Sequence, residues 1–594
     1  MHVDFAMKAS IGWSNTGSSV LVVLLAALCA QVATGSPAAT SRPGASSPAP
    51  GGAADLLLKS GSVYSVDDAR TWAQAIAIRA GRIAYVGTDR GAALYVTPST
   101  RVIDLKGKMV LPAFQDAHIH PISSGIQANS CTLIGLNTPT QYVAAIERYA
   151  AAHPDKPWIT GGGWLMSAFG PGGAPRRQLI DAVVPDRPVF LSSTDGHTYW
   201  ANTKALELAR ITNQTPDPPD GRIDRDPKTG AAIGSLQEGA GDLVASVVPP
   251  ATAAEHEAGL RYAIKLLNGY GITAVQDAQV SEDDLKAYRA VDRRGELSLR
   301  VVAAIWWERG LGLEQIDTIK RLRAEYSVGR IDAGTVKIML DGVMENYTAL
   351  MLKPYLKVPG EVRGIPMVKA DVLDEAVARL DAAGFQVHFH AIGDGAVREA
   401  LDAIERARHL NGDLGHRHHI AHLELIDAAD IPRFRELRVI ANFQPLWAFA
   451  DEYITNLTVP FLGPERSSRL YQIGSLYRSG AVVAFGSDWS VSSANPLEEI
   501  QVAVTRMGPA GETRTPFLPG ERINLPEALA AFTINAAYAN RLEKMTGSLE
   551  TGKNADLIVL DRNLFAIPTT EIAKARVLVT LFDGREVHGD LGAL

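Results

Sequence analysis

The sequence predicts an α/β protein with a (β/α)8 TIM-like barrel and a small composite β-sandwich domain formed from both chain ends. Two observations predict this fold. Within residues 111–545, apolar strands alternate with helical stretches such as 371–384 and 396–410, which is typical of a parallel sheet and, at this length, of a closed barrel. Residues 55–110 and 546–594 instead show short strands separated by turns, and neither set has enough strands to bury a face alone.

The composition is that of an ordinary globular enzyme. The chain has 594 residues, 46% of them hydrophobic, which is enough for a barrel and a second domain with a sizeable core. Its 58 Lys and Arg against 65 Asp and Glu give a net charge of −7, so we expect no nucleic-acid partner. The two cysteines exclude a disulfide scaffold and a cysteine-rich zinc module.

Residues 1–35 are predicted to be a signal peptide. The apolar run VLVVLLAALCA, residues 20–30, is too short to span a bilayer, which needs about 20 residues, but it suits the hydrophobic region of a signal. The only Lys of the preceding segment is Lys8, so an uncleaved anchor or a misassigned start methionine stays an alternative. We expect export to the periplasm or the medium, with no stable membrane span after the signal is removed. Residues 36–54, rich in Pro, Ala, Ser and Gly, are predicted to be a disordered linker.

Nine apolar segments compete for the eight barrel positions. In chain order they are VLPAFQDAHIH, PVFLSST, ITAVQDA, LRVVAAIWW, VKIMLDG, FQVHFHAIGD, HHIAHLEL, VIANFQP and VVAFGSD. We place PVFLSST, residues 188–194, outside the barrel. The stretch from about residue 130 to 255 is rich in Pro, Gly and Trp and interrupts the alternation of strand and helix, which predicts an insertion.

Side chains that bind metals lie at the C-terminal ends of these strands, the face of a parallel barrel that carries active sites. Histidine and carboxylate supply the nitrogen and oxygen ligands of zinc or a similar divalent ion. The first strand ends in two histidines spaced by two residues, so both point to the same side. A lysine also lies within VKIML, a strand otherwise suited to a dry core. The candidates are His118, His120, Lys337, His390, His422 and Asp488.

Each candidate alone has a structural explanation. A single histidine in an apolar strand is more often a core residue, and a lone lysine more often extends to solvent or forms an ion pair. The candidates taken together are stronger evidence for a metal site than any one of them. Four histidines at strand ends in three separate strand–helix units, followed by an aspartate that ends the last strand, are not expected by chance.

The motifs LPAFQDAHIHP, VKIMLDG, VHFHAIGD, IAHLE and AFGSDW, in this order, resemble the metal-dependent amidohydrolase superfamily. The best match is its amidohydrolase family 3 branch, which includes N-substituted formamide deformylases. The segments DGHTYWANTKAL, residues 195–206, and GSLETGKNADLIVLD, residues 547–561, resemble the same branch. The resemblance extends over about residues 55–590 and implies a (β/α)8 barrel with a composite β-sandwich.

The resemblance also implies a ligand set. His118 and His120 would hold one metal, and His390 and His422 the second. Lys337 matches a position that some members carboxylate on its amine. The carboxylation creates a bridging carbamate and removes the positive charge that disfavours burying a lysine. Whether the site holds one metal or two stays open. Zinc is the default by ligand type, and iron, manganese or nickel would fit the same ligands.

By the same resemblance, Asp488 would ligate the first metal and act as general base on a metal-activated water, whose pKa falls from ~15.7 toward ~7. It would then pass the proton to the leaving nitrogen. Ala113 stands where the family usually has Gly, and Ala421 replaces an acidic residue common before His422. His388, two residues before the metal candidate of its strand, is predicted to be a core histidine.

Further candidates concern the substrate. We expect His197, in an Asp-Gly-His loop, to reach over the barrel mouth to the substrate carbonyl, with a structural hydrogen bond as the alternative. Asp277 and Gln444 end other strands, so they point at the same mouth. Trp164 and Trp447 are candidates for an apolar pocket wall, although aromatics at such places equally often pack in the core.

The sequence therefore predicts an exported, metal-dependent hydrolase that cleaves a non-peptide carbon–nitrogen bond of a small-molecule amide, formamide or cyclic amide. An esterase, lactonase or dipeptidase on the same site is the alternative among enzymes. A dipeptidase would need a cation at the mouth to hold the substrate carboxylate, and none is identified. A degenerate, non-catalytic binding barrel is the alternative outside enzymes. A homodimer is expected only by analogy with the family.

Overall fold

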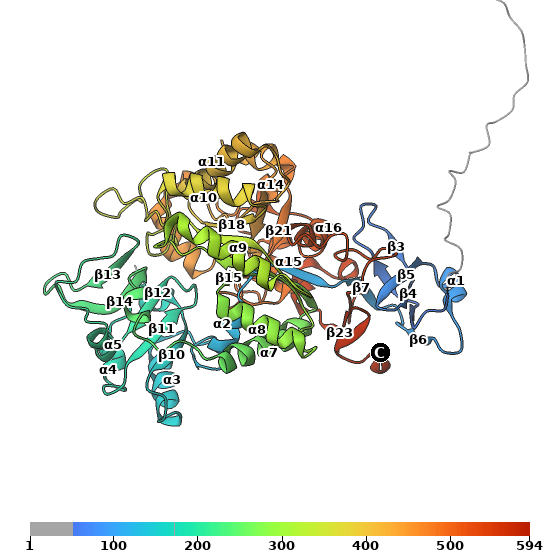
Figure 1. Ribbon diagram of the computed structural model, residues 1–594, viewed down its shortest axis with the longest axis horizontal. Coiled ribbons are helices and arrows are strands. Elements are labelled where there is room, and N and C mark those ends of the chain that lie inside the picture. Colours follow the sequence, from blue (N-terminus) through green and yellow to red (C-terminus); the bar gives the residue numbers. More distant parts are fainter. Residues whose placement is uncertain (1–51, 171–172) are drawn as a thin grey trace, which may run out of the picture. The chain divides into compact units, whose positions relative to one another are not determined.

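The computed structural model describes residues 52–170 and 173–594, and the stretch from Gly52 to Leu594 forms one compact unit (Figure 1). The predicted signal peptide and nearly all of the predicted linker lie outside the described residues. Ala54, near the start of the described part, is buried and its amide donates to the Tyr95 carbonyl at 2.9 Å. Among the described residues, no helix is long and apolar enough to cross a membrane.

Eight parallel strands form the central sheet, and their order in the sheet follows their order in the chain. This confirms the predicted eight-stranded parallel barrel, including the assignment of each apolar segment to a strand. The strands are β8 (Phe114–Ile119), β15 (Ile272–Val280), β16 (Arg300–Trp306), β17 (Ile331–Met339), β18 (Gln386–Ala391), β19 (His419–His422), β20 (Ile440–Phe443) and β21 (Val483–Phe485).

The sheet nearly closes where the last strand, β21, approaches the first, β8. Just beyond β21, the Asp488 amide donates to the His118 carbonyl at 2.8 Å, and the Asn442 side chain donates to the Ala117 carbonyl at 2.8 Å. A Cβ on Gly486 would lie 2.4 Å from the His118 nitrogen, so only glycine permits this approach. The closure brings the side chains at the ends of both strands together.

Helices connect the barrel strands (Figure 1). The first two begin with capping boxes, in which Thr252 and Ser281 each accept a hydrogen bond from the third residue of their helix. Each buries one apolar face, as amphipathic helices around a barrel must. The principal helices are α7 (Ala253–Gly269), α8 (Glu282–Arg293), α9 (Gln315–Tyr326), α10 (Ala370–Ala382), α11 (Asp394–Asn411), α12 (Ile431–Glu436), α13 (Val459–Ser467), α14 (Ile473–Ser479), α15 (Pro496–Thr505), α16 (Leu525–Ala531) and α17 (Ile534–Ala539).

A second sheet lies between β8 and α7 in the sequence, in the order β13-β14-β12-β11-β10-β9 (Figure 1). The segment PVFLSST corresponds to β11, which pairs within this sheet and not within the barrel. The strands of this sheet are β9 (Cys131–Thr132), β10 (Ile159–Trp164), β11 (Val189–Ser193), β12 (Thr198–Ala201), β13 (Gly221–Arg225) and β14 (Ala232–Glu238). The helices between β8 and α7 in the sequence are α2 (Pro121–Ala128), α3 (Pro139–Ala152), α4 (Gln178–Asp181), α5 (Thr203–Leu208) and α6 (Asp242–Ala245).

Both ends of the described chain contribute to two further sheets, in the orders β5-β4-β1-β6 and β24-β23-β22-β7-β2-β3. N-terminal β7 pairs antiparallel with C-terminal β22. Buried residues of both sheets, among them Leu58, Ile78, Val110 and Leu557, share one hydrophobic cluster. The strands are β1 (Leu56–Lys59), β2 (Ser62–Tyr64), β3 (Trp72–Ala73), β4 (Ala75–Arg79), β5 (Arg82–Gly87), β6 (Arg101–Asp104), β7 (Met109–Pro112), β22 (Leu557–Leu560), β23 (Val577–Phe582) and β24 (Arg585–His588).

A buried ion pair ties the C-terminal strands to the barrel. Arg300, the first residue of β16, lies 2.5 Å from Asp556 and also pairs with Asp583. Its guanidinium stands 4.5 Å over the Phe582 ring. Because Asp556 is fully buried, its charge depends on this arginine for compensation.

We expect Arg300→Met to lower the free energy of unfolding by about 3–5 kcal/mol, because it leaves a buried carboxylate without its counter-charge. Urea denaturation of the full chain measures the loss. The matched control is Arg576→Met, which removes an exposed arginine from an ion pair with Asp561 at 3.3 Å and is expected to have a much smaller effect. Equal effects of the two variants would contradict the assignment.

Candidate active site

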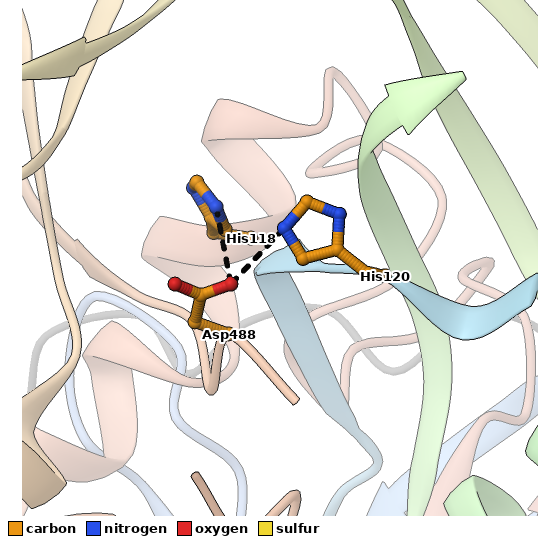
Figure 2. A group of neighbouring side chains, drawn as sticks. All are labelled: His118, His120 and Asp488. Carbon is orange, nitrogen blue, oxygen red and sulfur yellow. Dashed lines mark ion pairs between the residues drawn. The ribbon is translucent and has the colours of Figure 1, made fainter. Parts of the chain in front are cut away.

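Three side chains converge where the first and last barrel strands meet (Figure 2). Asp488 Oδ1 lies 3.1 Å from His120 Nε2 and 3.5 Å from His118 Nε2. One donor atom of each residue lies within 4.8 Å of the others, and Asp488 Oδ1 is buried without a hydrogen-bond donor among the described residues. Two imidazole nitrogens and an unsatisfied carboxylate oxygen at this spacing fit a divalent metal ion.

The remaining predicted ligands surround these three. Lys337 Nζ lies 3.4 Å from His118 Nε2, and His422 Nδ1 lies 3.8 Å from Asp488 Oδ2. The rings of His390 and His422 have centroids 4.4 Å apart. The structure therefore brings all of the predicted ligand candidates together at the C-terminal ends of the strands.

The Nδ1 atoms of three of these histidines contact buried polar partners. A proton on Nδ1 leaves the Nε2 lone pair free to bind a metal, and an acceptor oxygen beside Nδ1, as at His390 and His422, fixes that tautomer. The imidazole of His388 beside His118 can either accept or donate. His390 Nε2 is indeed buried without a hydrogen-bond partner among the described residues. The contacts are His118 Nδ1 to His388 Nε2 at 2.8 Å, His390 Nδ1 to Asp341 Oδ1 at 3.1 Å, and His422 Nδ1 to Gln444 Oε1 at 3.0 Å.

Sequence reasoning did not find these supporting roles. His388 is buried, as expected of a core histidine, but it also holds a ligand candidate. Gln444, a candidate for substrate contact, supports His422. Asp341 was not singled out, although its position at the end of VKIMLDG is the same signal that pointed to the ligands.

Burial sets the protonation of the cluster. It lowers the pKa values of His118, His390 and His422 well below the ordinary range, so these imidazoles are neutral, the form that binds metals. Burial also lowers the pKa of Lys337 to about 7, although the neighbouring Asp488 acts to raise it.

The pKa of His197 is shifted in the opposite direction. Its Nδ1 lies 2.9 Å from Glu238 Oε2, and Glu238 in turn accepts a hydrogen bond from the Thr348 hydroxyl at 2.6 Å. Burial acts to lower the pKa of His197, but Glu238, together with Asp195 and Asp488, outweighs burial and raises it to about 9. At neutral pH His197 is therefore an imidazolium, and its ring lies 5.2 Å from that of His390.

A cavity of about 220 Å³ opens beside these residues. His197, His390, His422 and Asp488 line it together with Trp447. The Trp447 ring stacks on His422 with centroids 5.4 Å apart and an interplanar angle of 5°. The cavity thus joins the predicted ligands to an aromatic wall.

Two other predicted substrate residues are not among those that line this cavity. Asp277 lies within β15, three residues before its end, and its Oδ2 accepts a hydrogen bond from the Tyr288 hydroxyl at 2.7 Å. Trp164 is fully buried, and its indole donates to the Leu191 carbonyl at 3.1 Å within the β9–β14 sheet. Both side chains have local structural partners.

The sequence profile of the amidohydrolase family matches residues 101–588. The chain belongs to the amidohydrolase family. This confirms the resemblance drawn from the motifs and agrees with a barrel whose strand ends gather histidines and an aspartate. As an amidohydrolase, the protein is a hydrolase of carbon–nitrogen bonds.

The chain is also similar to known relatives and to solved structures, which supports its membership of this family. The amidohydrolase is 31% identical to Protein LONG AFTER FAR-RED 3 of Arabidopsis thaliana, with 91% of this chain and 93% of the relative covered. It is 30% identical to the N-substituted formamide deformylase of Arthrobacter pascens, with 89% and 97% covered. An uncharacterized metal-dependent hydrolase from Pyrococcus furiosus superposes with a TM-score of 0.66 at 28% identity, with 86% of this chain and 99% of that chain covered.

The charge on His197 gives a test that needs no substrate. In histidine-labelled amidohydrolase, the imidazole resonance that disappears in His197→Asn should titrate with a midpoint near pH 9. We expect Glu238→Gln to move this midpoint to lower pH, because it removes the carboxylate that stabilises the imidazolium. An unchanged midpoint in this variant would show that Glu238 does not set the charge of His197.

Proposed function

We propose that this amidohydrolase hydrolyses a non-peptide carbon–nitrogen bond in a small amide, formamide or cyclic amide, with Asp488 as general base. The observation that carries the proposal is the convergence of His118, His120 and Asp488, with ligand atoms within 4.8 Å of one another, next to a cavity that Asp488 also lines. The likeness to an N-substituted formamide deformylase supports an amide-type bond.

The donor set fits a resident metal, with zinc the default by ligand type. When bound, a divalent ion lowers the pKa of a coordinated water toward ~7 and polarises a carbonyl oxygen. A second ion would use the free Nε2 of His390 together with His422, and carboxylation of the buried, readily deprotonated Lys337 would supply a bridging carbamate. The proposed ligands are His118, His120, Lys337, His390, His422 and Asp488.

The chain's own residues supply the proton transfers and orientation. The Asp488 carboxylate accepts the proton of the attacking water and returns it to the departing nitrogen. His197, an imidazolium held by Glu238, donates from Nε2 to the substrate carbonyl oxygen and stabilises the negative charge that develops there. Trp447 forms an apolar wall that orients the acyl or N-substituent and displaces water.

Metal content tests the ligand set. For protein purified without chelator or nickel affinity, mass spectrometry should find about two equivalents of metal per chain in the wild type and less in His118→Ala and Lys337→Ala. The matched control is His256→Ala, which removes a histidine paired with Asp284 outside the cluster and should leave the metal unchanged. One equivalent of metal that survives Lys337→Ala would show that Lys337 is not a ligand. No metal in folded, zinc-treated wild type would refute the metal site.

Substrate preference tests the reaction. A panel of N-substituted formamides, cyclic amides, esters, lactones and dipeptides should show the highest kcat/KM on an amide or formamide. We expect Asp488→Asn to reduce kcat roughly 10²–10⁴-fold because it removes the general base. A preference for esters would favour the esterase alternative, and full activity of Asp488→Asn would contradict the assigned base.

Two proposals concern the chain ends. We propose that the two sheets built from residues 55–110 and 546–594 form the composite β-sandwich domain, which their shared hydrophobic cluster supports. We also propose that residues 1–35 direct export. N-terminal sequencing of the protein recovered from cells should find a start near residue 36, and an intact first residue on cytosolic protein would contradict export.

A further inference from the structure

The cavity wall beyond the catalytic residues is acidic. It includes Glu345, which follows β17, and Glu424, which follows β19. Among the described residues that line the cavity, none is a lysine or an arginine. The imidazolium of His197 is already paired with Glu238. These two glutamates therefore face the cavity without a cation of their own.

Glu424 leaves hydrogen-bonding capacity unused at this wall. The residue is only 3% exposed, and its Oε2 is buried with no hydrogen-bond partner among the described residues. Burying a carboxyl oxygen without a donor is unfavourable, so such groups are rare unless a ligand or water satisfies them. Glu424 also lines the cavity, which places its carboxyl group beside the space that a ligand would occupy.

Glu345 is also buried and has only partly satisfied hydrogen-bonding capacity. The residue is 6% exposed, and its Oε1 accepts one long hydrogen bond, from the Thr458 hydroxyl at 3.3 Å. A carboxylate has about four acceptor sites, so most of its capacity is left for other donors. Two neighbouring acids with spare acceptors match a cationic group with several N–H donors.

We propose that Glu345 and Glu424 form a subsite for an organic cation, an ammonium, amidinium or guanidinium group carried by the substrate at the end remote from the scissile bond. The proposal rests on the proposed function for the position of that bond. The aromatic side chains of Trp447, Phe449 and Tyr453 line the same cavity and suit an apolar spacer between the two polar ends.

Equilibrium binding tests the subsite without turnover. The probes are benzylamine, which is a cation at pH 7, and benzyl alcohol, a neutral molecule of similar shape; neither has an acyl–nitrogen bond. Calorimetry with the metal-loaded full chain should give roughly tenfold to hundredfold tighter binding of benzylamine, the usual gain from charge-assisted hydrogen bonds. In Glu424→Gln and in Glu345→Gln, each nearly isosteric, this preference should fall toward unity.

The control is Glu452→Gln, which removes an exposed charge adjacent to the cavity residue Asp451 and should keep the preference. Circular dichroism checks that each variant folds, and either glutamine variant alone suffices for the test. A wild type without preference, or a preference that both variants retain, would overturn the subsite. Hydrolysis of neutral amides without cation preference would leave the proposed function intact, whereas cation binding without metal or hydrolysis would refute the function alone.

Discussion

The hydrogen bond from the Asp488 amide to the His118 carbonyl joins the last barrel strand to the first, and the site depends on it. Its two residues are also two of the proposed ligands, so closing the sheet and assembling the cluster are one event. Gly486 permits the approach because any Cβ there would meet the His118 backbone. A barrel that failed to close would separate the histidines at the end of β8 from the aspartate that follows β21.

The cluster is costly in the absence of a ligand, because it buries several imidazoles, a lysine and carboxylates. Hydrogen bonds between Nδ1 of three histidines and buried polar partners offset part of this cost. Three residues of this region, His422, Asp488 and Glu238, also adopt left-handed backbone conformations, with φ angles of 79°, 53° and 50°. Such conformations persist when the surrounding structure enforces them and are common at functional sites.

Much of this arrangement was predictable from the sequence, because strand periodicity places residues such as His118 and Asp488 at one end of a parallel barrel. The hydrogen-bond partners of the site residues were not predictable from the sequence. Gln444 supports His422 across adjacent strands, and the side-chain rotamers that make the contact are invisible to periodicity. The pairing of His197 with Glu238 forms inside the insertion, where no strand–helix rhythm fixes the relative positions of residues far apart in sequence.

The central claim is that these strand ends hold a divalent metal through the Nε2 atoms of their histidines. Anomalous diffraction at the absorption edge of the bound metal tests it most directly. The account predicts a peak about 2.0–2.1 Å from Nε2 of both His118 and His120, with an Asp488 oxygen at a similar distance. A peak bound through Nδ1, or located away from these three residues, would contradict it.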